Sequence, residues 1–163
     1  MNPSNRPIVR TCSLVVVTCS DFRLMYRGAL VREIDHEFGD ISFDLLTAPG
    51  GCHRIVRSSR EKRDLLVEDL RSVIQLHSPE TIALIQHEQC GVYHNEFKFV
   101  DWQEECEILK QDLQYAKSQL KEEFPGIRVR GFVARFELDD VQSLDEVVPY
   151  SGHPAANRLS EFE

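Results

Sequence analysis

Three short apolar segments, rich in β-branched residues, constrain the fold more than any other feature of the sequence. They cover residues 13–19 (SLVVVTC), 42–47 (SFDLLT) and 81–86 (TIALIQ). The first and third lack the alternation of polar and apolar residues that marks a strand with one solvated face. Such continuous apolar runs are typical of strands buried on both faces of a parallel sheet. A further strand is expected at 129–138 (VRGFVARFEL).

Segments with helical spacing of apolar residues separate these strands. They cover residues 24–38, 58–77 and 101–124. Ser58 and Glu61 have the spacing of a capping box at the start of the second helix. Asp101 and Glu104 have the same relation at the start of the third. Because strands alternate with helices, we expect βαβ units, and therefore a single α/β domain with a mainly parallel central sheet flanked by helices.

The ends of the chain lack the pattern of a packed core. Residues 1–12 are mostly polar and contain two prolines, and residues 151–163 show no apolar periodicity. We therefore expect a folded domain at 13–150, an N-terminal arm at 1–12 and a C-terminal tail at 151–163. Both end segments are candidates for arms that embrace a partner subunit across a twofold axis.

Charge and cysteine content exclude several classes of function. The formal net charge of −8 argues against nucleic-acid binding and against anionic membranes as partners, since both require a basic surface. No secretory signal is recognisable, and no apolar run approaches the roughly 18 residues that a membrane span needs. A cytoplasmic protein is therefore expected. In that reducing compartment, five cysteines predict free thiols or metal ligands rather than a disulfide framework.

Two short motifs stand where the first and third expected strands end. One is CSDFR at 19–23 and the other is HEQCG at 87–91. Ligands bind beyond the carboxyl ends of the strands in open parallel sheets, so both motifs fall where a site is expected. In an extended chain Cys19, Asp21 and Arg23 project to the same side, because the side-chain period is two.

The residue types in these motifs point to zinc. Cys19, His87 and Cys90 offer two thiolates and one imidazole, a nitrogen-and-sulfur set that zinc prefers. Three protein ligands leave one tetrahedral position open, which is typical of catalytic rather than structural zinc. The His-x-x-Cys spacing is weak evidence alone, but composition would supply both motifs together only about 0.005 times in such a chain.

The two motifs resemble the Cys-x-Asp-x-Arg and His-x-x-Cys signature of the β-class carbonic anhydrases, and the likeness covers most of residues 13–148. The small size and the CSDFR form are similar to short prokaryotic members and their carbonic anhydrase-like relatives. The resemblance implies reversible hydration of CO2 to bicarbonate by zinc-bound hydroxide, in a dimer or a multiple of dimers. By position it implies three zinc ligands and a catalytic dyad: Cys19, His87 and Cys90, with Asp21 and Arg23.

One stretch departs from that family. The second strand is usually followed by Arg-Asn-Ala-Gly, whereas this chain has TAPGG at 47–51, which keeps the glycine turn but lacks the Arg and the Asn. In the family this stretch borders the substrate pocket, so the substrate stays open. The same hydroxide attack would serve a zinc hydrolase of carbonyl sulfide or carbon disulfide.

A zinc-binding interaction module without turnover is the alternative outside the enzymes. The Asp21–Arg23 pair argues against it, because a structural zinc site does not need such a pair, although the pair can also be a purely structural ion pair. Whether Asp21 or water is the fourth zinc ligand is open. His53 and His94 are candidates for moving protons to the buffer.

Overall fold

The computed structural model describes residues 11–138 and 140–148. Residues 1–10 of the expected arm and the whole expected tail at 151–163 lie outside these residues. None of the helices in the described part of the chain is both long and apolar enough to cross a membrane.

Five strands form one sheet in the order β2-β1-β3-β4-β5. Their bounds are β1 (Leu14–Cys19), β2 (Phe43–Ala48), β3 (Thr81–His87), β4 (Arg128–Glu137) and β5 (Asp140–Glu146). The first four strands are parallel, and β5 runs antiparallel to β4 at the edge. The prediction of an α/β domain with a mainly parallel sheet is therefore confirmed.

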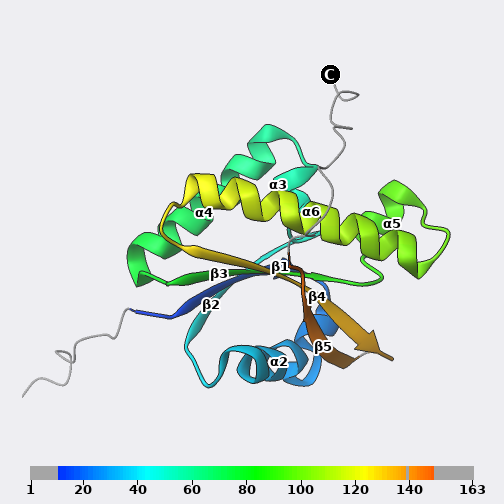
Figure 1. Ribbon diagram of the computed structural model, residues 1–163, viewed down its shortest axis with the longest axis horizontal. Coiled ribbons are helices and arrows are strands. Elements are labelled where there is room, and N and C mark those ends of the chain that lie inside the picture. Colours follow the sequence, from blue (N-terminus) through cyan, green and yellow to red (C-terminus); the bar gives the residue numbers. More distant parts are fainter. Residues whose placement is uncertain (1–10, 139, 149–163) are drawn as a thin grey trace, which may run out of the picture.

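Helices cover both faces of this sheet (Figure 1). They are α1 (Phe22–Met25), the 3-10 turn η1 (Tyr26–Gly28), α2 (Ala29–Phe38), α3 (His53–Val56), α4 (Arg60–His77), α5 (Gly91–Phe97) and α6 (Trp102–Glu123). Helices α4 and α6 lie on one face and α2 lies on the other. Every residue of β1 is buried, as expected for a central strand packed on both sides.

The long helix α6 is placed as its sequence predicts. Its apolar residues at spacings of three and four all pack into the core: Cys106, Leu109, Leu113, Ala116 and Leu120. The side chain of Asp101 accepts a hydrogen bond from the backbone N–H of Glu104, so Asp101 is the N-cap.

Two expectations about local structure were wrong, and one strand was missed. The single helix expected over 24–38 is broken into α1, η1 and α2, because Arg27 and Gly28 adopt positive φ angles of 50° and 72°. The capping box at Ser58 does not form, because α4 begins at Arg60 and Ser59 is its N-cap, without a side-chain cap bond. Strand β5 was not expected, since its sequence DVQSLDE is mostly polar; it forms by pairing with β4 and packing on α2.

The strand order creates a crevice at one end of the sheet. From β1 the chain continues to β2 on one side, and from β2 it returns to β3 on the other side of β1. The connections that leave β1 and β3 therefore diverge, and in doubly wound sheets this switch point is where ligands bind. Both sequence motifs lie at this point.

Candidate metal centre

Two thiols and one imidazole converge at the switch point. Cys19 is the last residue of β1, His87 is the last residue of β3, and Cys90 is the N-cap of α5. One ligand atom from each lies within 4.8 Å of the other two, and all three residues are buried. The two Sγ atoms are 4.0 Å apart. Parallel strands of matched register bring Cys19 and His87 to the same end of the sheet, and the short turn at 88–90 returns Cys90 beside them.

The His87 ring is oriented for metal binding. Its Nδ1 lies 2.9 Å from the carbonyl oxygen of Glu88, so Nδ1–H donates there and the lone pair is left on Nε2. Nε2 is fully buried and has no hydrogen-bond partner among the described residues. An unsatisfied buried acceptor is costly, and a cation held with the two sulfurs would satisfy it. The donor set and this orphaned nitrogen together fit zinc.

The electrostatics of the two thiols differ. A hydrogen bond from Cys90, the nearby His87 ring and the Gly50 N–H lower the pKa of Cys19, against the opposing effect of its burial. The pKa of Cys90 is raised, because its proton is shared with the neighbouring Cys19 sulfur and the group is buried. Both cysteines would bind a divalent cation as thiolates, so its binding would release their protons.

A glycine turn closes the centre next to Cys19. Gly51 has φ +55°, and a Cβ there would lie 2.3 Å from Oε1 of Gln86 and 3.1 Å from the backbone nitrogen of Cys19. The Gln86 amide donates to the carbonyl oxygen of Gly50 over 2.9 Å. Buried Gln86 therefore ties the turn after β2 to β3. Sequence reasoning missed this residue, although it is a buried polar residue at the end of a mostly apolar strand.

Asp21 and Arg23 form a bidentate ion pair at the edge of the centre. Arg23 donates from Nε to Asp21 Oδ1 over 3.0 Å and from Nη2 to Oδ2 over 2.9 Å. These hydrogen bonds hold the pKa of Asp21 below its ordinary value. Asp21 Oδ2 lies 3.9 Å from Nε2 of His87. An extended chain over residues 19–23 would place these side chains on one side, but the structure has a helix start here instead. Asp21 caps α1 by accepting a hydrogen bond from the Arg23 N–H, and this turn brings the two side chains together.

The loop that carries Cys90 is held by a second acidic residue. Glu105 of α6 is buried and accepts the backbone N–H of Gln89 over 2.7 Å. Gln89 has φ +57°, a conformation that costs energy for a non-glycine residue. Arg23 Nη2 donates to the carbonyl oxygen of Gln89 over 3.1 Å. The dyad and α6 thus hold the same strained residue, and no pattern in the sequence marks Glu105 for this role.

A buried polar network lies behind the centre, between α3, α5 and α6. Tyr93 donates to Oδ2 of Asp112 over 2.9 Å, and Arg57 binds the same carboxylate with two hydrogen bonds of 2.6 and 2.8 Å. The Cys52 thiol lies 3.8 Å from the Tyr93 hydroxyl, and burial raises the pKa of Cys52. These contacts fix α5, which begins at Cys90, against the helices around it.

The two histidines considered as proton carriers occupy different environments. His53 is largely buried, with Nε2 2.6 Å from a Glu96 carboxylate oxygen. His94 is more exposed, with Nε2 3.2 Å from Oε1 of Glu105. His94 therefore has the better access to buffer, and it shares Glu105 with the loop of the metal centre.

Solved structures similar to this one include carbonic anhydrases and a carbon disulfide hydrolase. The carbonic anhydrase of Streptococcus mutans matches with a TM-score of 0.53 at 17% identity, over 90% of this chain and 88% of that one. β-Carbonic anhydrase isoform I of Trichomonas vaginalis matches with a TM-score of 0.54 at 16% identity, over 90% of each chain. The apo form of a carbon disulfide hydrolase matches with a TM-score of 0.50 at 15% identity, over 83% of this chain and 80% of that one.

No family model matches the sequence, and no curated protein matches it. The structural matches extend over most of each chain, and the sheet with its flanking helices is common to them. At identities of 15–17% what is shared is the architecture. The chain has the fold of the β-carbonic anhydrases.

Proposed function

We propose that this protein is a zinc enzyme that hydrates CO2 reversibly to bicarbonate. One observation carries the proposal: the buried cluster of Cys19, His87 and Cys90 has an ionised carboxylate, that of Asp21, at its edge. A structural zinc site has no use for such a carboxylate, whereas a hydration reaction needs an acceptor beside the attacking water. The similarity of fold to carbonic anhydrases supports the same activity.

The ligand residues would bind zinc with the two sulfurs and Nε2 of His87. Zinc held there would supply a Lewis acid that lowers the pKa of a water molecule; for a carbonic anhydrase zinc held by three histidines that pKa is about 7. The Glu88 carbonyl oxygen keeps the His87 proton on Nδ1 and so keeps Nε2 available as a ligand.

Asp21 and Arg23 would act on the proton of the attacking water. The Asp21 carboxylate accepts its hydrogen bond and thereby aims an oxygen lone pair at the CO2 carbon. Arg23 is a positioning residue: its two bonds to Asp21 keep the carboxylate ionised and fixed, and its bond to Gln89 holds both relative to the Cys90 loop. If Asp21 itself occupied the fourth zinc position, the centre would be closed to substrate.

A related reaction is the second candidate. The fold is shared with a carbon disulfide hydrolase, and the glycine turn at 47–51 lacks the Arg and Asn that carbonic anhydrases usually have there. Attack of the same nucleophile on carbon disulfide or carbonyl sulfide would need no further catalytic group. A zinc-binding module without turnover is the remaining alternative.

The proposal is tested on zinc-loaded protein by the initial rate of CO2 hydration. Cys90→Ala should lose the zinc ion of this centre, as measured by elemental analysis, and with it the activity. Full zinc retention in Cys90→Ala would refute the ligand assignment. If the wild type is inactive toward CO2 but hydrolyses carbon disulfide, then carbon disulfide replaces CO2 as the proposed substrate. Inactivity toward both would favour the non-catalytic module.

A second variant separates catalysis from metal binding. Asp21→Ala should retain zinc, because three ligands remain, yet lose about 10²–10³ in turnover, the usual cost of removing one positioned hydrogen-bonding group. Asp69→Ala, an exposed residue of α4, serves as control and should keep wild-type turnover. Wild-type activity in zinc-loaded Asp21→Ala would mean that the dyad is only structural.

We also propose a cytoplasmic homodimer, or a multiple of dimers. All five cysteines are free thiols, an arrangement that a reducing compartment preserves. Large apolar side chains are exposed on the segment that directly follows Asp21: Phe22, Met25 and Tyr26. Such a patch beside a site is typical of a surface that another subunit covers.

A further inference from the structure

A second cluster of metal-ligating side chains lies at the opposite end of the sheet. Cys12 precedes β1, Asp44 is the second residue of β2, and His77 is the last residue of α4. One ligand atom from each lies within 4.8 Å of the other two. The strands between this cluster and the centre at Cys19 place the two roughly 20 Å apart, at about 3.3 Å per strand residue.

From this convergence we propose that Cys12, Asp44 and His77 form a second binding site for a borderline-soft divalent cation of the zinc type. Sulfur, nitrogen and carboxylate oxygen are the three donor types that zinc takes from proteins. The set contains one thiolate, where the centre at the switch point contains two. It is therefore a chemically distinct site, and the proposed hydration reaction does not depend on it.

In the structure one carboxylate oxygen lies between the other two candidate ligand atoms. Oδ2 of Asp44 lies 3.0 Å from Sγ of Cys12 and 2.5 Å from Nδ1 of His77, so a single oxygen accepts from both neighbours. Ligands bound at about 2.0–2.3 Å around a tetrahedral zinc lie roughly 3.3–3.7 Å apart. Spreading the three atoms by less than an ångström, with loss of the shared protons, would make room for the ion.

The backbone already holds the three ligands together. Cys12 N–H donates to the carbonyl oxygen of His77 over 3.1 Å, and Asp44 is paired with Val15 in the parallel ladder of β1 and β2. Each ligand thus comes from a separate element whose position the fold fixes. Such preorganisation reduces the entropy that binding would otherwise cost.

Solvent can reach the cluster. The His77 and Asp44 side chains are 34% and 29% exposed, which leaves an entry path and a position for water as a fourth ligand. Without metal, burial and the Asp44 carboxylate raise the pKa of the Cys12 thiol to about 11. Binding must therefore displace a proton from Cys12, as in other thiolate sites.

The rival explanation is a hydrogen-bonded triad that binds no metal. It would tie the end of α4 and the start of β2 to the residues before β1 without any ion. The two explanations differ in the number of zinc ions per chain, so the stoichiometry decides between them.

The experiment measures zinc by equilibrium dialysis of the full chain at micromolar free zinc. We expect two zinc ions per chain in the wild type and one in His77→Gln. His36→Gln, which changes an exposed histidine of α2, is the matched control and should keep two. Cys90→Ala should keep the one ion of the second site. A wild type that binds a single ion, or a His77→Gln variant that still binds two, would overturn the proposal.

Cobalt provides a readout independent of stoichiometry and activity. In a Cys19→Ala/Cys90→Ala background, added Co²⁺ should give a thiolate-to-cobalt charge-transfer band from Cys12 alone. Adding Cys12→Ser should abolish that band. If the background variant does not fold, the wild type with two Co²⁺ ions should lose about one third of the band in Cys12→Ser, because one of three thiolates is removed. If Cys12→Ser leaves the charge-transfer band unchanged in either setting, the site is refuted. The rate of CO2 hydration by His77→Gln is a separate measurement, and it tests the proposed function.

Discussion

At the level of single residues, the candidate metal centre depends on how closely the backbone of one turn approaches a buried side chain. Gly51 leaves room for the Gln86 amide and for the backbone nitrogen of Cys19. Its positive φ is also unfavourable for other residues. Steric space and backbone conformation therefore both require glycine at the position next to the proposed ligand.

Gly51→Ala should lower both the stability and the zinc affinity of the protein. The added methyl group would overlap Gln86 and push on Cys19, and overpacking of this kind costs about 1–3 kcal/mol. Gly28→Ala is the control: Gly28 has φ +72° but nothing lies within 4 Å of its Cβ position. Urea unfolding and zinc titration of both variants would measure the difference. Equal losses in the two variants would show that φ strain alone is responsible.

Sequence reasoning named the proposed ligand residues, which the structure brings together, but not the residues that hold them. Cys19 and His87 could be placed because each ends a buried strand, and topology then brings strand ends together. Glu105 could not be placed, because its role depends on the angle at which α6 crosses the loop of Gln89. Side-chain patterns report burial along one element and carry no information on such a crossing.

At the level of elements, α6 is tied to the helices behind the metal centre by one buried carboxylate. Asp112 is 3% exposed and accepts hydrogen bonds from both Arg57 and Tyr93. Arg57 also stacks on the ring of Phe97, 4.5 Å from its centroid. Three helices therefore meet at this one charged group.

Asp112→Ala should destabilise the protein by about 3–5 kcal/mol, the cost of breaking one side of a buried ion pair. The substitution would leave Arg57 partly buried and deprive Tyr93 of its acceptor. Glu107→Ala, on the exposed side of the same helix, should change the free energy of unfolding by less than about 0.5 kcal/mol. Denaturant unfolding monitored by circular dichroism measures both. A loss in Asp112→Ala no larger than the control would mean that the network is not a structural support.

The elements that sequence predicted well are those with a strong apolar period of their own. The strands β1 and β3 and the helix α6 bury their apolar faces where expected. The strand β5 was missed because its residues pair with β4 through the backbone, and its stability comes from that partner. The break at Arg27 was missed for a similar reason: an arginine with positive φ leaves no mark in the apolar pattern.

At the level of the whole molecule, buried or half-buried ion pairs make stability depend on pH. Hydrogen bonds from Arg130 lower the pKa of Glu146 in the folded state, and those from Arg23 do the same for Asp21. A carboxyl group with a lowered folded-state pKa stabilises the fold above its unfolded pKa. That contribution is lost as pH falls through the folded-state value.

The urea midpoint should therefore fall as the pH is lowered below roughly 4, near the ordinary pKa values of Asp and Glu. Glu146→Gln should make this fall shallower, because the group no longer takes up a proton on unfolding. Glu107→Gln, at an exposed position of α6 that forms no ion pair with the described residues, should leave the slope unchanged. A slope in Glu146→Gln equal to that of the wild type would mean that Arg130 does not stabilise the carboxylate.

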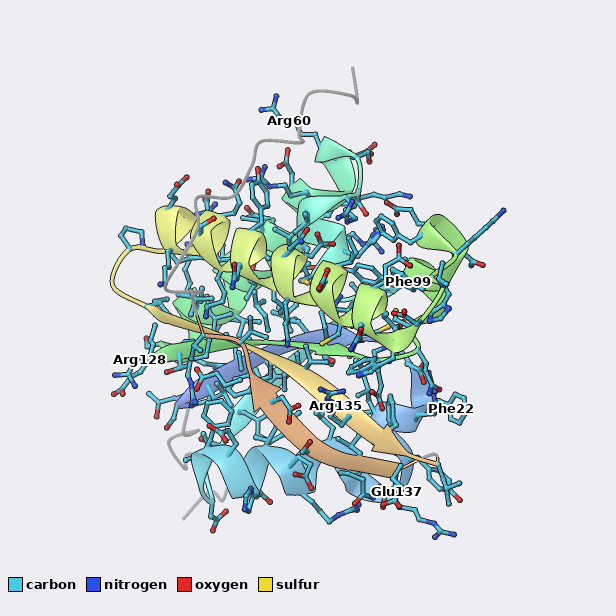
Figure 2. All side chains as sticks on the ribbon, turned by 45° about the vertical axis from the view of Figure 1, so that its right-hand side comes forward. Phe22, Arg60, Phe99, Arg128, Arg135 and Glu137 are labelled. Carbon is cyan, nitrogen blue, oxygen red and sulfur yellow. The ribbon has the colours of Figure 1, made fainter. Side chains whose placement is uncertain are left out.

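The exposed apolar segment that directly follows Asp21 is the main support for the proposed homodimer. Phe22 is 73% exposed and projects from the surface (Figure 2), and Met25 and Tyr26 are 44% and 45% exposed. The segment directly follows Asp21, so a subunit that covered it would also shield the dyad from solvent. A twofold axis near this segment would pair it with its own copy, as closed symmetric dimers do.

Light scattering at micromolar concentration should show a dimer for the wild type. The double variant Phe22→Asp/Tyr26→Asp should be a monomer, because dimerisation would bury two charges on each subunit without partners. Leu65→Asp is the matched control: Leu65 is 62% exposed on α4, and its replacement should leave the dimer intact. The monomeric variant should also bind zinc, since no ligand comes from this segment, but its CO2 hydration should fall as water reaches Asp21. A wild type that is monomeric and fully active would refute the dimer. A dimeric double variant would place the interface on another surface.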